Sequence, residues 1–126
     1  MLSGGGAKIV PETFYRWVKS DLATEEDFRP QGAMGRRMRF PSTDPEVIRA
    51  WNEGLSVWIS REAATEKAKA IKFLAGSYVV AITLEDGHEF EVVGPTGKDR
   101  DHYTIYGDAR KLLALASEPR KMTGAP

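Results

Sequence analysis

The amino-acid sequence predicts a single α+β domain, in which a mainly antiparallel sheet carries three to four short helices. Three observations predict this class. Apolar residues alternate with a period of two in several short segments, as in half-buried strands. Two expected helix starts carry capping-box residues. The dipeptide Asp86-Gly87 lies between two segments rich in β-branched residues, where it is typical of a hairpin turn.

The domain is expected to occupy residues 11–118 of the 126-residue chain. Residues 1–10 contain Ser3-Gly4-Gly5-Gly6 and predict a flexible lead-in. Residues 119–126 predict a frayed tail. A chain of this length buries roughly two-thirds of its unfolded surface around one core.

Composition excludes several classes of protein. Hydrophobic residues make up 41% of the chain and charged residues 29%, as in globular domains. The 18 basic and 18 acidic side chains balance, so no net charge favours nucleic acid or a membrane surface. Cysteine is absent, which excludes disulfides and cysteine nucleophiles. No apolar run approaches the ~20 residues of a membrane span and no signal-peptide core is present, so a cytoplasmic location is expected.

The first half of the domain is expected to begin with a strand over residues 14–19, which are rich in aromatic and β-branched side chains. Thr24 begins a capping box, with Asp27 in the usual place of Glu, and predicts a short helical turn. A second capping box at residues 43–46 predicts a helix that ends at Gly54.

The middle of the chain predicts a strand, a helix and a hairpin. Residues 55–60 alternate as a strand, and Ser60 is the expected N-cap of a helix over residues 61–75. Strands at residues 77–85 and 88–93 would flank the Asp-Gly turn. A two-residue turn fixes the register of a hairpin, so the expected pairs are Glu85 with His88 and Thr83 with Phe90.

The last elements are a strand at residues 102–107 and a helix at residues 109–116, with Asp108 as its cap. His102 shares a strand face with Thr104 and Tyr106. A lone histidine in such a place is more often structural than catalytic, and two histidines in the whole chain make a metal site unexpected.

The strand at residues 55–60 has an unusual polar face. Its odd-numbered residues are aliphatic, whereas Ser56, Trp58 and Ser60 share the other face. Two small hydroxyls around a large aromatic ring resemble the wall of a cleft that stacks on a flat ligand. The alternative is a half-exposed strand in which Ser60 acts only as a helix cap.

Arg16 is a second candidate site residue. It shares a strand face with Phe14 and Val18, and an arginine among apolar neighbours needs a partner. That partner is either an internal carboxylate or a ligand phosphate. The alternative is an edge-strand side chain that extends to water.

The loop at residues 29–39 is a third candidate, because it contains arginines but no acid. Its glycines would let the backbone approach a phosphate, and the alternative is a solvated loop. The chain has no glycine-rich phosphate-binding motif, and a nucleic-acid site in this loop would depend on charge alone. The four arginines are Arg29, Arg36, Arg37 and Arg39.

Two segments resemble the skeleton of small bacterial ADP-ribosyltransferase-like domains. One is the early Tyr15-Arg16, and the other is residues 54–58 (GLSVW) before an alanine-rich helix. The Ser-Thr-Ser motif of the arginine–serine–glutamate class is absent, and SVWIS stands in its place. The segments YR, GLSV and HYTIYGD also resemble those of uncharacterised bacterial proteins, a likeness that assigns no reaction.

The resemblance implies that NAD is the substrate and that Arg16 binds its phosphates, with Arg36 from the loop beside it. Ser56 would position the nicotinamide end. Residues 89–91 match the Glu-x-Glu motif of that class in sequence, so the late catalytic residue would be Glu91 or Glu89. His102 or Tyr103 would be the substitute. Stacking on nicotinamide would come from Trp58 or Tyr15.

Two other functions remain open from the residues alone. One is a non-enzymatic module that binds a nucleotide, RNA or a protein through the arginine-rich loop and the aromatic strands. The other is a structural subunit whose aromatic strands form a dimer surface. A charged group beside Ser56 would favour the enzyme, since catalysis of transfer requires one and binding does not.

Overall fold

The computed structural model describes residues 12–38, 41–70, 78–96 and 100–121. It confirms the predicted α+β class: over these residues three α-helices accompany a six-stranded antiparallel sheet. The strands are β1 (Thr13–Val18), β2 (Gly54–Trp58), β3 (Tyr78–Thr83), β4 (Glu91–Val93), β5 (His102–Tyr106) and β6 (Arg120–Lys121). The helices are α1 (Pro45–Glu53), α2 (Arg61–Lys69) and α3 (Ala109–Leu115), with short 3-10 turns η1 (Glu25–Phe28) and η2 (Gly32–Met34).

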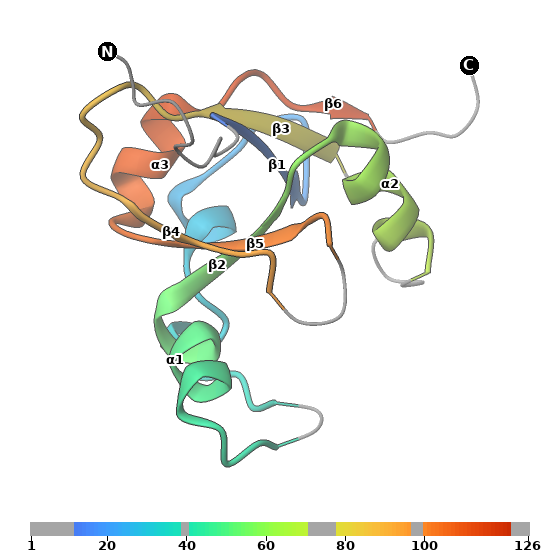
Figure 1. Ribbon diagram of the computed structural model, residues 1–126. Helices are drawn as coiled ribbons and strands as arrows, with labels where there is room; N and C mark the ends of the chain where they lie inside the picture. Colours follow the sequence, from blue (N-terminus) through green and yellow to red (C-terminus); the bar gives the residue numbers. More distant parts are fainter. Residues whose placement is uncertain (1–11, 39–40, 71–77, 97–99, 122–126) are drawn as a thin grey trace.

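The strand order across the sheet is β4-β5-β2-β1-β3-β6 (Figure 1). Strand β1 lies near the centre, where Tyr15 pairs with Trp58 of β2 on one side and with Ala81 of β3 on the other. Strand β2 in turn pairs with β5, with Ser56 opposite Thr104. These registers place β1, β2 and β5, which carry most of the predicted site residues, side by side.

The predicted hairpin at Asp86-Gly87 is wrong. A turn does form there, because the His88 N–H donates to the Glu85 carbonyl at 3.1 Å and Gly87 has a φ of 79°. However, β3 pairs with β1 and β6, whereas β4 pairs with β5 at the far side of the sheet. Both edges of β3 are occupied, so residues 88–93 have no edge left to pair with, and Thr83 pairs with Thr13 instead of Phe90.

The ends of the helices follow the sequence signals closely. The capping box at Thr24 is present, and Ser60 caps α2 by accepting a hydrogen bond from the Ala63 N–H at 3.0 Å. The cap of α1 is Asp44 instead of Thr43, since the Asp44 carboxylate accepts from the Glu46 N–H at 2.9 Å. The predicted end of α2 at residues 70–76 lies largely outside the described residues.

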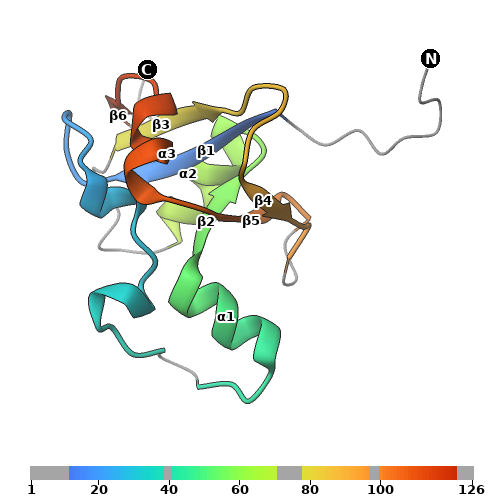
Figure 2. The same cartoon turned by 90° about the vertical axis from the view of Figure 1, so that its left-hand side faces the viewer.

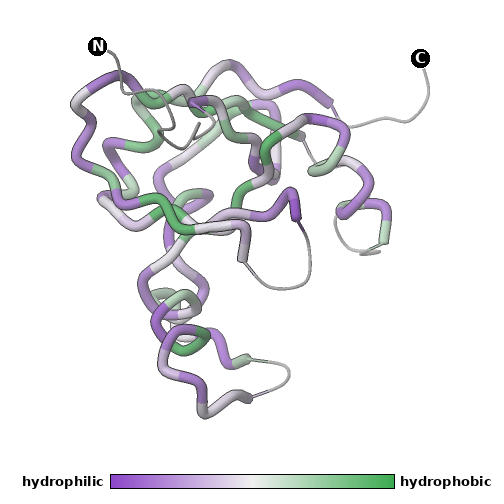
Figure 3. Tube along the Cα trace, viewed as in Figure 1, coloured by the Kyte–Doolittle hydropathy of each residue, from purple (hydrophilic) through white to green (hydrophobic). Residues whose placement is uncertain are grey.

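The two faces of the sheet carry separate apolar clusters. One face holds the main core, which includes Phe14, Leu55, Val57 and Ile105, and α3 and η1 pack on it. The other face holds a smaller cluster around Trp58 beneath α2. Figure 3 shows hydrophobic segments along the strands of the sheet and also within the helices.

Helix α1 projects from the sheet instead of packing on it, as both ribbon views show (Figures 1 and 2). None of its residues is buried, and the apolar side chain of Val47 is 44% exposed. Trp51 is half-buried, and its indole N–H donates to the Arg36 carbonyl at 2.9 Å. The helix is therefore anchored through its last turn and through strand β2, which follows it directly.

Candidate functional site

The two residues that the transferase resemblance requires together lie on opposite faces of the sheet. Arg16 lies between Phe14 and Val18, whose side chains belong to the main core. Ser56 lies between Leu55 and Val57, which belong to the same core, so the alternation of a strand places the Ser56 side chain on the other face. The side chains of Arg16 and Ser56 therefore do not converge on one cleft.

The guanidinium of Arg16 is held by the main chain. Its Nε donates to the Asp27 carbonyl at 2.9 Å, and its Nη1 donates to the Ser56 carbonyl at 2.9 Å. Burial lowers the pKa of Arg16 to about 10, and the nearby Asp27 carboxylate partly offsets that shift. The partners of Arg16 are thus two main-chain carbonyls and not the carboxylate or phosphate that the sequence predicts, and these bonds tie η1 to the centre of the sheet.

Trp58 is a core residue and not the wall of an open cleft. It is only 3% exposed, and its ring stacks on Trp17 with the ring centroids 4.4 Å apart. The rings of His102 and Trp58 meet edge to face, with their centroids 5.1 Å apart. Helix α2 covers this pair, because the Trp17 indole N–H donates to the Ala64 carbonyl at 2.7 Å. The stacking position predicted for a ligand is therefore filled by Trp17.

The candidate late carboxylates are both exposed and paired with bases. Glu91 accepts from Arg49 at 2.8 Å, and this hydrogen bond lowers the pKa of Glu91. The Arg49 guanidinium also lies 3.8 Å above the ring of Tyr106. Glu89 accepts from Lys111 at 2.8 Å.

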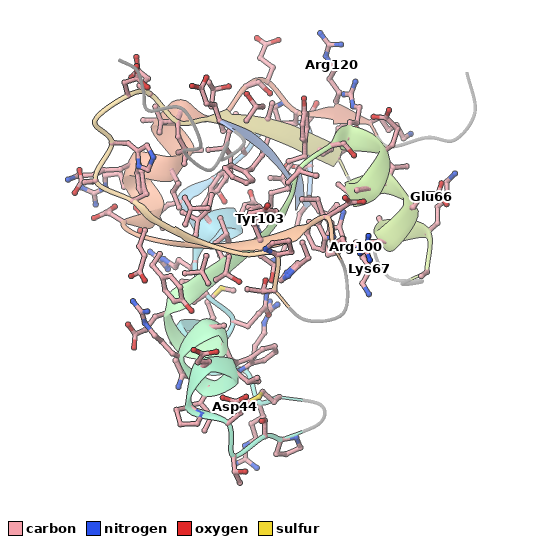
Figure 4. The ribbon with its side chains drawn as sticks, in the orientation of Figure 1. Asp44, Glu66, Lys67, Arg100, Tyr103 and Arg120 are labelled. Carbon is pink, nitrogen blue, oxygen red and sulfur yellow. The ribbon has the colours of Figure 1, made fainter. Side chains whose placement is uncertain are left out.

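His102 and Tyr103, the substitutes for these carboxylates, lie on opposite faces of β5. The Nδ1 of His102 is 2.7 Å from the hydroxyl of Thr96, which also lies 3.3 Å from the hydroxyl of Thr104. Tyr103 lies on the core face, with its ring centroid 5.5 Å from that of Phe14, and Figure 4 shows it over the middle of the sheet. Both residues thus have structural partners.

The arginine-rich loop is partly neutralised by its surroundings. Arg29 forms an ion pair with Glu25 at 2.7 Å, and Arg36 donates to the Gln31 side chain at 2.8 Å. Arg37 is exposed, and Arg39 lies outside the described residues. Among the described residues, the side-chain hydrogen bond of Arg36 is with Gln31 and not with another predicted cofactor-binding residue.

A pocket of about 460 Å³ lies on the sheet face that carries Tyr15. Its floor is Tyr15 and Ala81, which pair across β1 and β3. One wall is Arg61, the first residue of α2, and the other is the segment from Ser117 to Arg120. The described residues that line the pocket are Tyr15, Arg61, Val79, Val80, Ala81, Ser117, Glu118 and Arg120.

The far wall of this pocket is fixed to the edge of β3. The Ser117 N–H donates to the Ala81 carbonyl at 2.8 Å, and the Ser117 hydroxyl accepts from the Ala81 N–H at 2.9 Å. Three residues further on, Arg120 of β6 pairs with Val79 of β3. Figure 4 shows Arg120 at the rim of the sheet beside this strand.

Among these lining residues, the sequence singles out only Tyr15 as a candidate site residue. The sequence predicts Arg61 only as the start of a helix and places Arg120 in a frayed tail, whereas the structure has Arg120 and Lys121 in β6. No local motif marks either arginine. The sequence marks Tyr15 as an aromatic residue on an early strand, and the rest of the pocket depends on the tertiary fold.

The charges of the pocket favour an anionic ligand. Among the described residues, neither Arg61 nor Arg120 has a carboxylate within ion-pair distance. Arg61 also begins a nine-residue helix whose N-terminus carries partial positive charge. A guanidinium without an internal partner is a donor for phosphate or carboxylate groups.

The chain matches no family model, no curated protein and no solved structure. Within the described part of the chain, no helix has the length and apolar character needed to cross a membrane. The same residues contain no group of three or more His, Asp or Glu side chains arranged to hold a metal ion.

Proposed function

We propose that this protein is a non-enzymatic binding module for a nucleotide, held in the pocket over Tyr15. The observation that carries the proposal is that the pocket is lined by one aromatic ring and by two arginines that form no ion pair with a carboxylate among the described residues. A nucleotide needs these two chemistries together, because its base stacks on an aromatic face and its phosphate binds a guanidinium.

The phosphate is assigned to Arg61. Arg61 is the first residue of α2 and lines the pocket, so a phosphate bound there would gain from both the side chain and the helix dipole. Arg120 on the opposite wall supplies a second positive charge that draws an anion into the pocket.

The base is assigned to the floor. Tyr15 is half-buried, and its neighbour Ala81 is small, so a planar ring can lie over both residues. A volume of about 460 Å³ falls in the range of small-molecule sites and suits one nucleotide.

A binding module accounts for the geometry better than the transferase. The resemblance requires Arg16, Ser56 and a late carboxylate around one substrate, but Arg16 is engaged with main-chain carbonyls on the core face. Glu91, on the same face as Ser56, is paired with Arg49. NAD contains nucleotide groups that suit the same pocket, so it belongs among the ligands to be tested.

The proposal is tested by isothermal titration calorimetry of the full chain with AMP, GMP and NAD, alongside a nicotinamide-release assay. We expect saturable binding without release of nicotinamide. Arg61→Gln should weaken binding about tenfold or more, because a charge-assisted bond is worth roughly 1.5–3 kcal/mol. Tyr15→Leu keeps the apolar contact but removes the stacking face, and should weaken binding by a similar factor.

Arg100→Gln is the matched control, because Arg100 is exposed and does not line the pocket (Figure 4). It should leave the affinity unchanged. Absence of binding at millimolar nucleotide would exclude the module. Nicotinamide release that depends on Ser56 and Glu91 would instead support the transferase.

A further inference from the structure

We infer that the pocket selects guanine over the other bases through Glu118 and Arg120. This inference depends on the proposed nucleotide-binding function and names the base that the site would take. It begins from an observation that phosphate binding leaves unexplained: a carboxylate, Glu118, lines a pocket that is otherwise suited to an anion.

The hydrogen bonds of Ser117 place the segment that carries Glu118 beside the expected base. Going across the strands the order is Tyr15, Ala81 and then Ser117, because Tyr15 pairs with Ala81 and Ser117 is hydrogen-bonded to Ala81 on its other edge. A planar base over Tyr15 and Ala81 therefore directs one edge at the segment that carries Ser117 and Glu118. Arg120 lies in the same wall.

The charges of the two walls orient the ligand. Arg61 and the N-terminus of α2 form one wall, and Glu118 lies in the other. A phosphate beside Glu118 would be repelled, so the phosphate binds at Arg61 and the base edge meets Glu118. Among the described residues Glu118 has no basic partner within ion-pair distance, which leaves its oxygens available as acceptors.

Guanine is the base whose edge matches this wall. Its Watson–Crick edge presents two neighbouring N–H donors, N1–H and the 2-amino group, which one carboxylate accepts together. The adjacent O6 is an acceptor and suits the guanidinium of Arg120, as arginine contacts to guanine do elsewhere. Adenine and cytosine each present one amino group there, and uracil presents one ring N–H.

The test is calorimetric titration of the full chain with GMP, IMP, AMP and XMP. IMP lacks the 2-amino group, and XMP carries an oxygen in its place. We expect GMP to bind at least about tenfold more tightly than AMP, which is the scale of one bidentate contact to a base. IMP should fall between them, and XMP should bind most weakly because its oxygen faces the carboxylate.

Glu118→Gln should reverse the preference for the group at position 2, because the amide N–H₂ donates to the oxygen of XMP. Affinity for GMP should fall to that for AMP, and affinity for XMP should rise. Glu85→Gln, an exposed glutamate in the turn before β4, is the matched control and should change none of these values.

The outcomes separate this inference from the proposed function. Equal affinity of the wild-type protein for all four nucleotides would overturn guanine selection and leave nucleotide binding intact. An equal increase for all four in Glu118→Gln would show that Glu118 acts only as a general charge, and would also overturn it. Absence of binding by any nucleotide would remove both.

Discussion

Trp17 and Trp58 stack on each other across neighbouring strands, with ring centroids 4.4 Å apart and an angle of 29° between the rings. Helix α2 closes over this pair through the bond from the Trp17 indole to Ala64. Trp58 thus stabilises the join between the sheet and α2, and its large apolar area is removed from water by protein and not by a ligand.

Trp58→Ala should destabilise the protein by about 3–5 kcal/mol, the usual cost of deleting a buried tryptophan. The reason is the loss of the stack with Trp17 and the cavity left beneath α2. Urea denaturation followed by far-UV circular dichroism measures this change. Trp58→Phe, which keeps an aromatic ring, is the control and should cost markedly less. A Trp58→Ala protein of normal stability that no longer binds nucleotide would show that Trp58 contacts the ligand.

Arg16→Ala should destabilise the protein by about 3 kcal/mol or more, because two carbonyls lose their donor and each unsatisfied group costs about 1–3 kcal/mol. Arg16→Lys should recover only part of this loss, since one ammonium does not reproduce the planar fork that reaches both Asp27 and Ser56. Thermal melts with and without AMP separate stability from binding. Unchanged stability together with lost nucleotide binding would make Arg16 a ligand residue.

The parts of the fold that the sequence predicts correctly are those decided by local chemistry. Ser60 and Asp108 each accept from N–H groups at a helix start, and Asp27 accepts from the Thr24 N–H in the first capping box, so all three depend on neighbours in sequence alone. The alternation of residues 55–60 likewise predicts which side chains of β2 enter the main core.

The errors concern contacts between segments far apart in sequence. The Asp86-Gly87 signal predicts a turn, and a turn forms, but it does not specify which strand lies beside β3. In the same way, the strand face with Ser56, Trp58 and Ser60 has residue types typical of a cleft wall. Only the position of α2 shows that Trp58 on this face is covered. The pocket unites Tyr15, Arg61 and Arg120 from three distant segments, so no local spacing reveals it.

Stability should fall on acidification partly through Glu25, which lies between Arg29 and Arg110. The hydrogen bond from Arg29, followed by that from Arg110, lowers the pKa of Glu25 below its ordinary value of 4.5. The unfolded chain then binds more protons than the folded one, so this contribution is present above pH 4.5 and is lost as pH falls through the folded pKa.

Glu25→Gln should therefore lose less melting temperature between pH 6 and pH 3 than the wild type does, as measured by thermal melts at low salt. Glu62→Gln is the control, because Glu62 is exposed and has no ion pair among the described residues. The same acid-induced loss in wild type and Glu25→Gln would show that this carboxylate does not contribute to the pH dependence.

Gly54→Ala should destabilise the protein through a collision, although its φ of −103° suits any residue. An added Cβ would clash with the Cγ2 of Thr104 and would lie 2.9 Å from the Ala50 carbonyl. Forcing one methyl group into such a packed site costs typically about 1–3 kcal/mol. Thr104→Ser removes Cγ2 but keeps the hydroxyl that faces Thr96, so the double variant should recover part of the loss.

Gly87→Ala is the contrasting control, because open space surrounds the added Cβ while the φ of 79° disfavours it. Its cost should be about 1–2 kcal/mol from the backbone alone. Urea denaturation of the single and double variants forms two mutant cycles with Thr104→Ser. The Gly54 cycle should show coupling and the Gly87 cycle should be additive. Additivity in both cycles would show that a methyl group at residue 54 does not collide with Thr104, and would contradict the prediction.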